Sequence, residues 1–266
     1  MDERFSRQSF LGTDSDRVLE KAAVAIVGLG GGGSHIVQQL AHIGVGDFLL
    51  IDPDVIEEAN LNRLVGGTRE DVAYNRPKTT IAERTIRNIN PEARIVSFRR
   101  NWNEVADHLR DRDVIFGCVD TFKDRRELEI ASRRAMIPYI DIGMDVHEEG
   151  ESFRISGQVI LSLPGQPCMK CLGFLSEDKL AREAAHYGSV GARPQVVWPN
   201  GILASFAVGV FMQLLTPWHD GHSQTIYLDY DGNDLTVGKC HRLNELPLIH
   251  CPCFVDPTNL GDPFWG

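Results

Sequence analysis

A run of glycines between an apolar segment and a helical pattern is the first feature of this sequence that indicates chemistry. The apolar segment 24–27 leads into Gly28, Gly30, Gly31 and Gly33. Glycines lack Cβ, so the backbone can turn tightly and approach a phosphate, whose charge a helix N-terminus favours. Asp52 lies 19 residues past Gly33, about where nucleotide-binding α/β folds place an acid on the ribose hydroxyls. The spacing predicts a nucleotide site.

Polar and basic residues follow the predicted strand that ends at Asp52, and another carboxylate ends a later strand. These side chains are Asn60, Arg63, Lys78 and Asp120. Open α/β sheets bind ligands just beyond the carboxyl ends of their strands, so a shared site is expected. Three of these residues also have an ordinary explanation, since Arg63 and Lys78 would be common surface cations and Asp120 a helix N-cap. Their co-occurrence favours the site.

Four of the six cysteines form two close pairs. Cys168 pairs with Cys171, and Cys251 pairs with Cys253 after 79 intervening residues. Four thiolates in two pairs suit a closed tetrahedral zinc site. Unliganded thiols are the alternative, but paired cysteines in a cytosolic protein are more often metal ligands than disulfides. Cys118 lies inside an apolar segment and is predicted to be a core residue.

The composition is that of an ordinary globular protein, with 42% hydrophobic and 24% charged residues in 266. Lysine and arginine number 27 against 37 aspartate and glutamate, and the net charge of −10 disfavours a general nucleic-acid-binding surface. The first residues do not resemble a signal peptide. The longest apolar stretch, 201–215, is interpreted as a buried helix that is too short to span a bilayer. We therefore predict a cytoplasmic protein with no membrane partner.

Strands and helices alternate through the first half of the chain, which would bring these side chains to one edge of a sheet. Strands are predicted at 24–27, 47–52, 93–98, 114–120 and 137–142, and helices at 35–44, 79–89 and 123–135. The alternation predicts an α/β fold with a Rossmann-like, doubly wound, mostly parallel sheet of about five strands. Strands predicted after residue 152 lack intervening helices, which indicates an antiparallel C-terminal extension.

We expect these elements to form a single domain over residues 1–266. Residues 1–22 form a helical lead-in and residues 23–150 form the nucleotide-binding half. Residues 151–266 form the antiparallel extension, which contains the predicted zinc site.

The motifs occur in the order typical of one known family. The chain resembles the ThiF/MoeB/HesA family, the adenylating enzymes related to eukaryotic ubiquitin-activating enzymes. The resemblance covers nearly the whole chain. It rests on the Arg4-x-x-Arg7-Gln8 opening, the glycine motif, Asp52-x-Asp54, Asn60-Leu61-Asn62-Arg63, Pro77-Lys78, Val119-Asp120 and Cys168-x-x-Cys171. It implies ATP-dependent adenylation of a carboxylate, usually the C-terminal glycine of a ubiquitin-like or sulfur-carrier protein, with release of pyrophosphate.

The resemblance also assigns roles to residues. Asp52 would hold the ribose of ATP beside the glycine motif, and Asp120 would hold Mg²⁺. The residues implied to bind the phosphates are Asn60, Arg63 and Lys78. Arg7 would reach the site from the other subunit of a homodimer. Fixed cations and a metal ion would offset the charge that builds on the phosphoryl oxygens, so Arg63, Lys78, Asp120 and Arg7 are the expected catalytic residues.

Two departures from the family pattern leave alternatives open. The second cysteine pair is C-x-C where the family has C-x-x-C, so Cys240, His241 or His250 could complete the zinc site. The segment 173–200 has no cysteine, although family members that form a thioester carry one there. We expect the chemistry to stop at the acyl adenylate, which a conjugating or sulfur-transfer protein then attacks. The alternative is that Cys240 folds back into the site.

Three functions remain open at this point. The leading hypothesis is an adenylating enzyme for a protein that ends in Gly-Gly. The second is adenylation of a peptide, small-molecule or tRNA-linked carboxylate, of which the acidic net charge disfavours the tRNA version. The third is an NAD-dependent oxidoreductase, which explains the glycines and Asp52. It leaves four residues without a role: Asn60, Arg63, Lys78 and Asp120.

Overall fold

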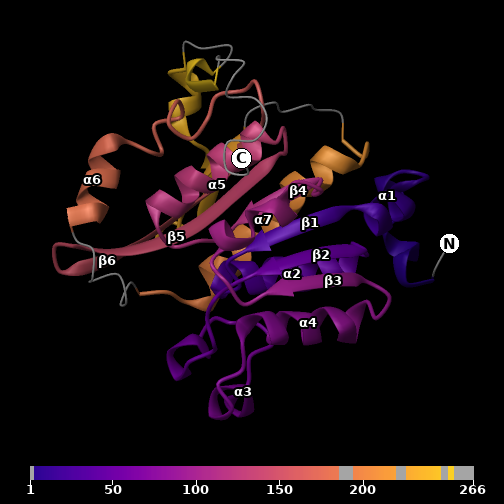
Figure 1. Ribbon diagram of the computed structural model, residues 1–266. Coiled ribbons are helices and arrows are strands. Elements are labelled where there is room, and N and C mark those ends of the chain that lie inside the picture. Colours follow the sequence, from indigo (N-terminus) through magenta and orange to yellow (C-terminus); the bar gives the residue numbers. More distant parts are fainter. Residues whose placement is uncertain (1–2, 186–193, 220–225, 247–250, 255–266) are drawn as a thin grey trace.

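One mixed sheet forms the centre of the molecule (Figure 1). The computed structural model describes residues 3–185, 194–219, 226–246 and 251–254. The sheet has eight strands in the order β3-β2-β1-β4-β5-β6-β7-β8. The strands are β1 (Ala23–Val27), β2 (Asp47–Ile51), β3 (Arg94–Phe98), β4 (Val114–Gly117), β5 (Tyr139–Glu149), β6 (Ser152–Ser162), β7 (Ile226–Asp231) and β8 (Thr236–Lys239).

The pairing of the strands confirms the predicted architecture. β3, β2, β1, β4 and β5 pair in parallel, whereas β6, β7 and β8 continue the same sheet in antiparallel pairing. The strand order reverses between β1 and β4, because β2 and β3 lie on one side of β1 and β4 on the other. In such sheets the crevice at the reversal is where ligands bind.

Helices cover both faces of the sheet. They are α1 (Ser15–Lys21), α2 (Gly31–Ile43), α3 (Arg69–Ala73), α4 (Lys78–Ile89), α5 (Phe122–Arg134), α6 (Glu177–Ala185) and α7 (Val197–Leu215). Short 3₁₀ segments lie at η1 (Glu3–Leu11), η2 (Glu58–Asn60), η3 (Trp102–Leu109), η5 (His241–Asn244) and η6 (Pro252–Phe254).

The side chains of β1 point alternately to the two faces of the sheet, and the core therefore has two layers. Val24 and Ile26 pack with α2 and α7 on one face, whereas Ala25 and Val27 pack with α5 and η3 on the other. Because successive side chains of a strand point to opposite faces, a parallel strand covered on both faces is apolar throughout. The continuous apolar segment that predicted β1 has this cause.

Two expectations for the C-terminal half were wrong. Helices α6 and α7 lie between β6 and β7, so the antiparallel strands do have intervening helices. α6 has no fully buried residue, so it lacks the buried apolar face of a core helix. α7 begins at Val197 rather than at residue 201, because Pro199 lies in its first turn, where no helical N–H bond is needed.

α7 is therefore longer than the apolar stretch suggested. The helix has 19 residues and is long and apolar enough to cross a membrane. The expectation that this segment is too short was therefore wrong. Half of the helix is buried inside the protein, against α2, β5 and β6. α7 thus has the contacts of a core helix, as predicted.

Candidate functional site

The glycine motif forms the turn between β1 and α2. Gly28 has a positive φ of 89°, and a Cβ there would overlap the carbonyl oxygen of Cys118. A Cβ at Gly33 would overlap the carbonyl oxygen of Gly28. By contrast, among the described residues no heavy atom outside its immediate chain neighbours lies within 4 Å of the position that a Cβ would take at Gly30. Gly28 and Gly33 are thus required by the fold, whereas Gly30 faces open space in which a phosphate can approach the backbone.

This difference between the glycines gives a testable prediction. Gly30→Ala is expected to leave the melting temperature unchanged and to weaken ATP binding by about tenfold or more, because its methyl group enters the ligand space. Gly33→Ala, the matched control, is expected to lower the melting temperature. Calorimetric titration with ATP and thermal unfolding measure both effects. Unchanged ATP affinity in Gly30→Ala would contradict the assignment.

The carboxylate of Asp52 joins the end of β2 to the glycine turn. Its Oδ2 accepts a hydrogen bond of 2.6 Å from the backbone N of Leu29, and its Oδ1 accepts one of 2.9 Å from that of Asp54. Burial raises the pKa of Asp52, and the positive charge of Lys78 opposes this shift. A carboxylate offers about four acceptor positions, so Asp52 retains the capacity to accept from ribose hydroxyls.

Lys78 is the first residue of α4 and lies beside two carboxylates. Its Nζ is 2.8 Å from Oδ2 of Asp54 and 3.9 Å from Oδ1 of Asp52. Asn60 accepts a hydrogen bond of 3.1 Å from the backbone N of Glu57 through Oδ1, so this bond does not use its amide nitrogen. Arg63 donates from Nη1 to the carbonyl oxygen of Ala59 at 2.6 Å. These residues place ammonium, amide and guanidinium donors in one segment between β2 and α4.

A buried carboxylate, that of Asp71, holds this segment in place. Arg84 donates two hydrogen bonds of 2.7 Å to it, and Arg76 lies 3.0 Å away through Nε. The bonds from Arg84 hold the pKa of Asp71 well below its ordinary range. Arg76 immediately precedes Pro77 and Lys78, so this ion-pair network positions the start of α4.

The Asp71 network predicts a pH-dependent stability. Asp71→Asn is expected to lower the free energy of unfolding at pH 7 by about 3 kcal/mol, because both arginines lose a buried partner. A lowered carboxyl pKa contributes stability that is present above the unfolded value, about 3.9, and is lost as the pH falls towards the folded value. The difference between wild type and variant, measured by urea unfolding from pH 7 downwards, should therefore shrink below about pH 4. A difference that is constant with pH would contradict this account.

Asp120 lies exposed between β4 and α5. The N-cap of α5 is Thr121, whose side chain accepts from the backbone N of Asp124, so the helix-cap alternative for Asp120 was wrong. Cys118, two residues earlier, is half-buried: it packs against the main core cluster, as predicted, and it also lines the cavity. Burial nevertheless raises the pKa of the Cys118 thiol well above its ordinary value, which makes it a poor nucleophile.

A cavity of about 1080 Å³ brings most of the predicted residues together. Its lining includes Gly28, Gly30, Gly31, Asp52, Asn60, Arg63, Lys78 and Asp120. Gly33 is not part of the lining, because it packs against Gly28. The cavity lies at the carboxyl ends of β1, β2 and β4, where the strand order reverses, and its size is at the upper end for small-molecule sites.

Three residues that line the cavity were not predicted, namely Arg125, Gln158 and Lys179. Arg125 of α5 donates from Nη1 to Oδ2 of Asp141 at 2.6 Å, and Gln158 donates to the same oxygen at 3.1 Å. Arg125 and Gln158 line the cavity, and Arg125 and Asp141 are buried. The sequence did offer one signal for this ion pair: Asp141 lies within the apolar segment 139–142, and a buried carboxylate needs a charged or hydrogen-bonding partner. Lys179 of α6 also lines the cavity, where burial lowers its pKa.

Arg7 of this chain is far from the cavity. Its segment η1 packs at the C-terminal end of α2, where Phe5 lies against Gly44 and Gln8 donates to the carbonyl oxygen of Ile43. That end of the sheet holds the amino ends of the parallel strands, and Figure 1 shows the indigo segment beside α1, where the described chain begins, away from the tip of the β1 arrow. Arg7 is not among the residues that line the cavity.

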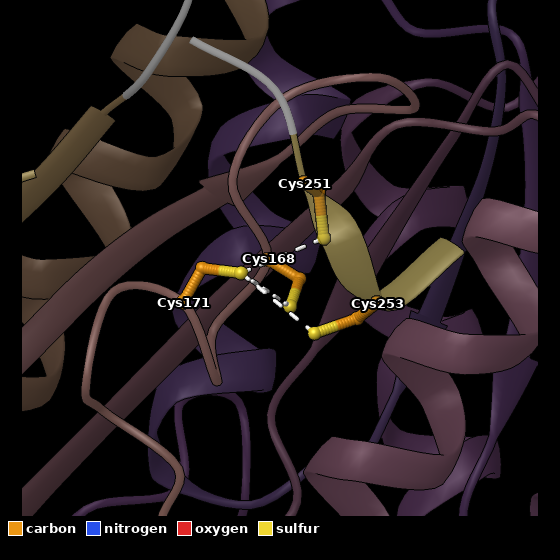
Figure 2. A group of neighbouring side chains, drawn as sticks. All are labelled: Cys168, Cys171, Cys251 and Cys253. Atoms are coloured by element: carbon orange, nitrogen blue, oxygen red, sulfur yellow. Dashed lines mark hydrogen bonds between the residues drawn. The ribbon is translucent and has the colours of Figure 1, made fainter. Parts of the chain in front are cut away.

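The four paired cysteines converge on one point (Figure 2). The Sγ of Cys171 is 3.6 Å from those of Cys168 and Cys251 and 3.8 Å from that of Cys253. Tetrahedral zinc with bonds of about 2.3 Å places its sulfur ligands about 3.8 Å apart, so the cluster has the dimensions of a zinc site. The hydrogen bond with the Cys168 thiol lowers the pKa of the Cys251 thiol.

Two of the three alternatives for the fourth ligand, Cys240 and His241, belong to another group of side chains. Cys240 and His241 group with Asp229 and not with the four-cysteine cluster, so they are not needed there. His250 lies outside the described residues. The C-x-C pair therefore completes a group of four thiols whose Sγ atoms all lie within 4.8 Å of one another.

Comparison with known proteins identifies similar chains. A family model described as the ThiF family matches residues 4–253. The SAMP-activating enzyme E1 of Haloferax volcanii is 30% identical over 201 residues, which are 73% of this chain and 71% of the relative. Ubiquitin-like modifier-activating enzyme 5 of Dictyostelium discoideum is 31% identical over 257 residues, which are 87% of this chain and 63% of the relative. Molybdopterin-synthase adenylyltransferase of Escherichia coli is 31% identical over 179 residues, 65% of this chain and 68% of the relative.

Solved structures share the fold. The crystal structure of E. coli MccB with succinimide matches with a TM-score of 0.74 at 21% identity, and covers 90% of this chain and 72% of that one. The structure of PaaA matches with a TM-score of 0.69 at 22% identity, and covers 90% of this chain and 82% of that one.

Proposed function

This chain belongs to the ThiF family, and from that premise we propose that it catalyses the ATP-dependent adenylation of a carboxylate. The proposed carboxylate is the C-terminal glycine of a ubiquitin-like or sulfur-carrier protein that ends in Gly-Gly. The observation that supports this function most strongly is the meeting of Asp52, Lys78 and Asp120 at one cavity beside Gly30. An NAD-dependent oxidoreductase would use Asp52 and Gly30 but would leave Lys78 and Asp120 unexplained.

The proposed reaction moves charge onto the phosphates. A carboxylate oxygen attacks the α-phosphorus of ATP, and the bond to the departing pyrophosphate breaks. Lys78 and Arg63 would offset the charge on the phosphoryl oxygens, and Asp52 would orient the ribose. Mg²⁺ prefers oxygen ligands, so the exposed carboxylate of Asp120 fits it, and the ion would neutralise phosphate charge when bound.

The acyl adenylate is proposed to be the end product on this chain. Cys118 is the one cysteine among the described residues that line the cavity, and burial raises its pKa. Cys240 is buried beside Tyr227 and does not line the cavity, which argues against its folding back into the site. A conjugating or sulfur-transfer protein would then supply the nucleophile that attacks the adenylate.

Pyrophosphate exchange tests the proposal. The purified chain, with ATP, Mg²⁺ and a small protein that ends in Gly-Gly, should exchange labelled pyrophosphate into ATP. The same protein without its last glycine is the matched control and should not support exchange. Exchange with a peptide or another small carboxylate instead would favour the alternative substrate class. Binding of NADH without binding of ATP would contradict adenylation altogether.

We also propose a homodimer in which Arg7 acts in the other subunit's site. The remote position of η1 in its own chain supports this arrangement, because a cation there cannot reach its own cavity. Equal amounts of Arg7→Ala and Asp120→Ala subunits should then recover about a quarter of wild-type exchange, since random pairing makes half the dimers mixed, each with one intact site. No recovery, with subunit exchange confirmed by native mass spectrometry, would exclude a role in trans.

A further inference from the structure

A second group of metal-ligating side chains lies at the far edge of the sheet. Asp229 of β7, Cys240 after β8 and His241 at the start of η5 each offer one ligand atom, and these atoms all lie within 4.8 Å of one another. The group shares no residue with the four-cysteine cluster or with the cavity lining. Nothing in the proposed adenylation uses it.

The register of the β7–β8 hairpin explains why Asp229 and Cys240 meet. Asp229 pairs with Gly238, and Cys240 lies two residues further along the same edge, so both side chains are on one face. In the part of the chain that the structure describes, no heavy atom outside its chain neighbours lies within 4 Å of the position that a Cβ would take at Gly238. The carboxylate of Asp229 can therefore reach over Gly238 to the thiol of Cys240, which lies diagonally opposite, directly after the neighbouring strand β8.

Backbone hydrogen bonds fix the thiol and the residue after it. The backbone N of Cys240 donates to the carbonyl oxygen of Tyr227 at 2.8 Å, and Leu243 N donates to the carbonyl oxygen of Cys240 at 3.1 Å. Arg242 donates from Nη1 to the carbonyl oxygen of Gly173 at 3.1 Å, which attaches η5 to the loop after the first cysteine pair. The adjacent residues Cys240 and His241 are thus held by a folded framework on both sides.

The donor set selects a class of metal. One thiolate, one imidazole and one carboxylate suit zinc or a similar transition ion, whereas Mg²⁺ and Ca²⁺ require oxygen ligands. Thiolate and carboxylate together balance the charge of a divalent cation. Cys240 is buried and His241 is exposed, so one side of the group is open to solvent. Three protein ligands with an open side are typical of a site that keeps a position for water or another ligand.

We propose that Asp229, Cys240 and His241 bind a second divalent transition ion, such as Zn²⁺ or Co²⁺, with one coordination position open. This site is separate from the four-cysteine cluster and is independent of the proposed adenylation. The closed cluster should retain its ion during purification, whereas the open site should exchange with metal in solution.

Cobalt titration of the purified 266-residue chain tests the proposal. Added Co²⁺ should bind as one further equivalent, with a thiolate-to-cobalt charge-transfer band in the near ultraviolet. Cys240→Ser should remove that band, and His241→Gln, a change at an exposed position that leaves the core intact, should weaken binding of this equivalent by about tenfold or more. Cys118→Ser is the matched thiol control and should leave the band unchanged. Absence of the further equivalent, or its persistence in both Cys240→Ser and His241→Gln, would overturn the proposal.

Discussion

The Asp120→Ala variant is expected to lose adenylate formation and to keep its fold. The carboxylate is exposed at the cavity and does not cap α5, because Thr121 does so. Its removal should therefore cost no helix stability. The proposed Mg²⁺ ion would lose its carboxylate ligand, and the phosphates would lose the charge that this ion offsets. Loss of one fixed electrostatic contact at a reacting centre commonly lowers the rate by about 100- to 1000-fold.

Pyrophosphate exchange and thermal unfolding of the same preparation check this prediction. Asp120→Asn should be nearly as defective, because it keeps the shape of the side chain and removes only its charge. Asp107→Asn, an exposed carboxylate of η3 outside the cavity lining, is the control and should exchange at the wild-type rate. Near wild-type exchange in Asp120→Ala would show that this carboxylate is not part of the reaction.

Removal of metal from the four-cysteine cluster is expected to have the largest effect on stability. The cluster joins the loop after β6 to η6, which are far apart in the sequence. Glu129 of α5 supports it, because its Oε1 accepts from the backbone N of Met169 at 2.8 Å. Zinc binding in small structural sites is worth about 10–16 kcal/mol, so its loss should lower the free energy of unfolding by several kcal/mol.

Elemental analysis, thiol titration and thermal unfolding measure this effect. The purified protein should retain zinc after dialysis against a weak chelator, and Cys171→Ser should both lose that zinc and melt at a lower temperature. Cys118→Ser again provides the matched control and should retain the metal. Protein without zinc in which all six thiols react freely would contradict a zinc site at this cluster.

The features that the sequence predicted are those encoded by local residue types. The turn at Gly28 and Gly33 was predictable because only glycine fits where a Cβ would overlap backbone atoms. The parallel strands were predictable because burial on both faces makes them continuously apolar. The C-x-x-C and C-x-C pairs were recognisable because thiols in such pairs have few other uses.

The features that were missed depend on contacts between distant segments. The Arg125–Asp141 ion pair exists because α5 packs on β5, and neither residue alone indicates the other. The N-cap of α5 could be assigned to Thr121 rather than Asp120 only when the backbone of the first turn of the helix was known. α7 extends past Pro199 because proline is tolerated in a first helical turn, a position that composition alone does not identify.

The position of β1 at the centre of the sheet has a consequence for the growing polypeptide. Val24 pairs with Phe48 of β2 on one side and with Val114 of β4 on the other. A nascent chain can therefore assemble β1, β2 and β3 first, while the second edge of β1 stays open until β4 has been synthesised. An open, apolar strand edge is a template for pairing with other chains. Ribosome pausing between β3 and β4 should accordingly be the stage at which this protein aggregates, and chaperone binding to chains arrested there should fall once β4 has emerged.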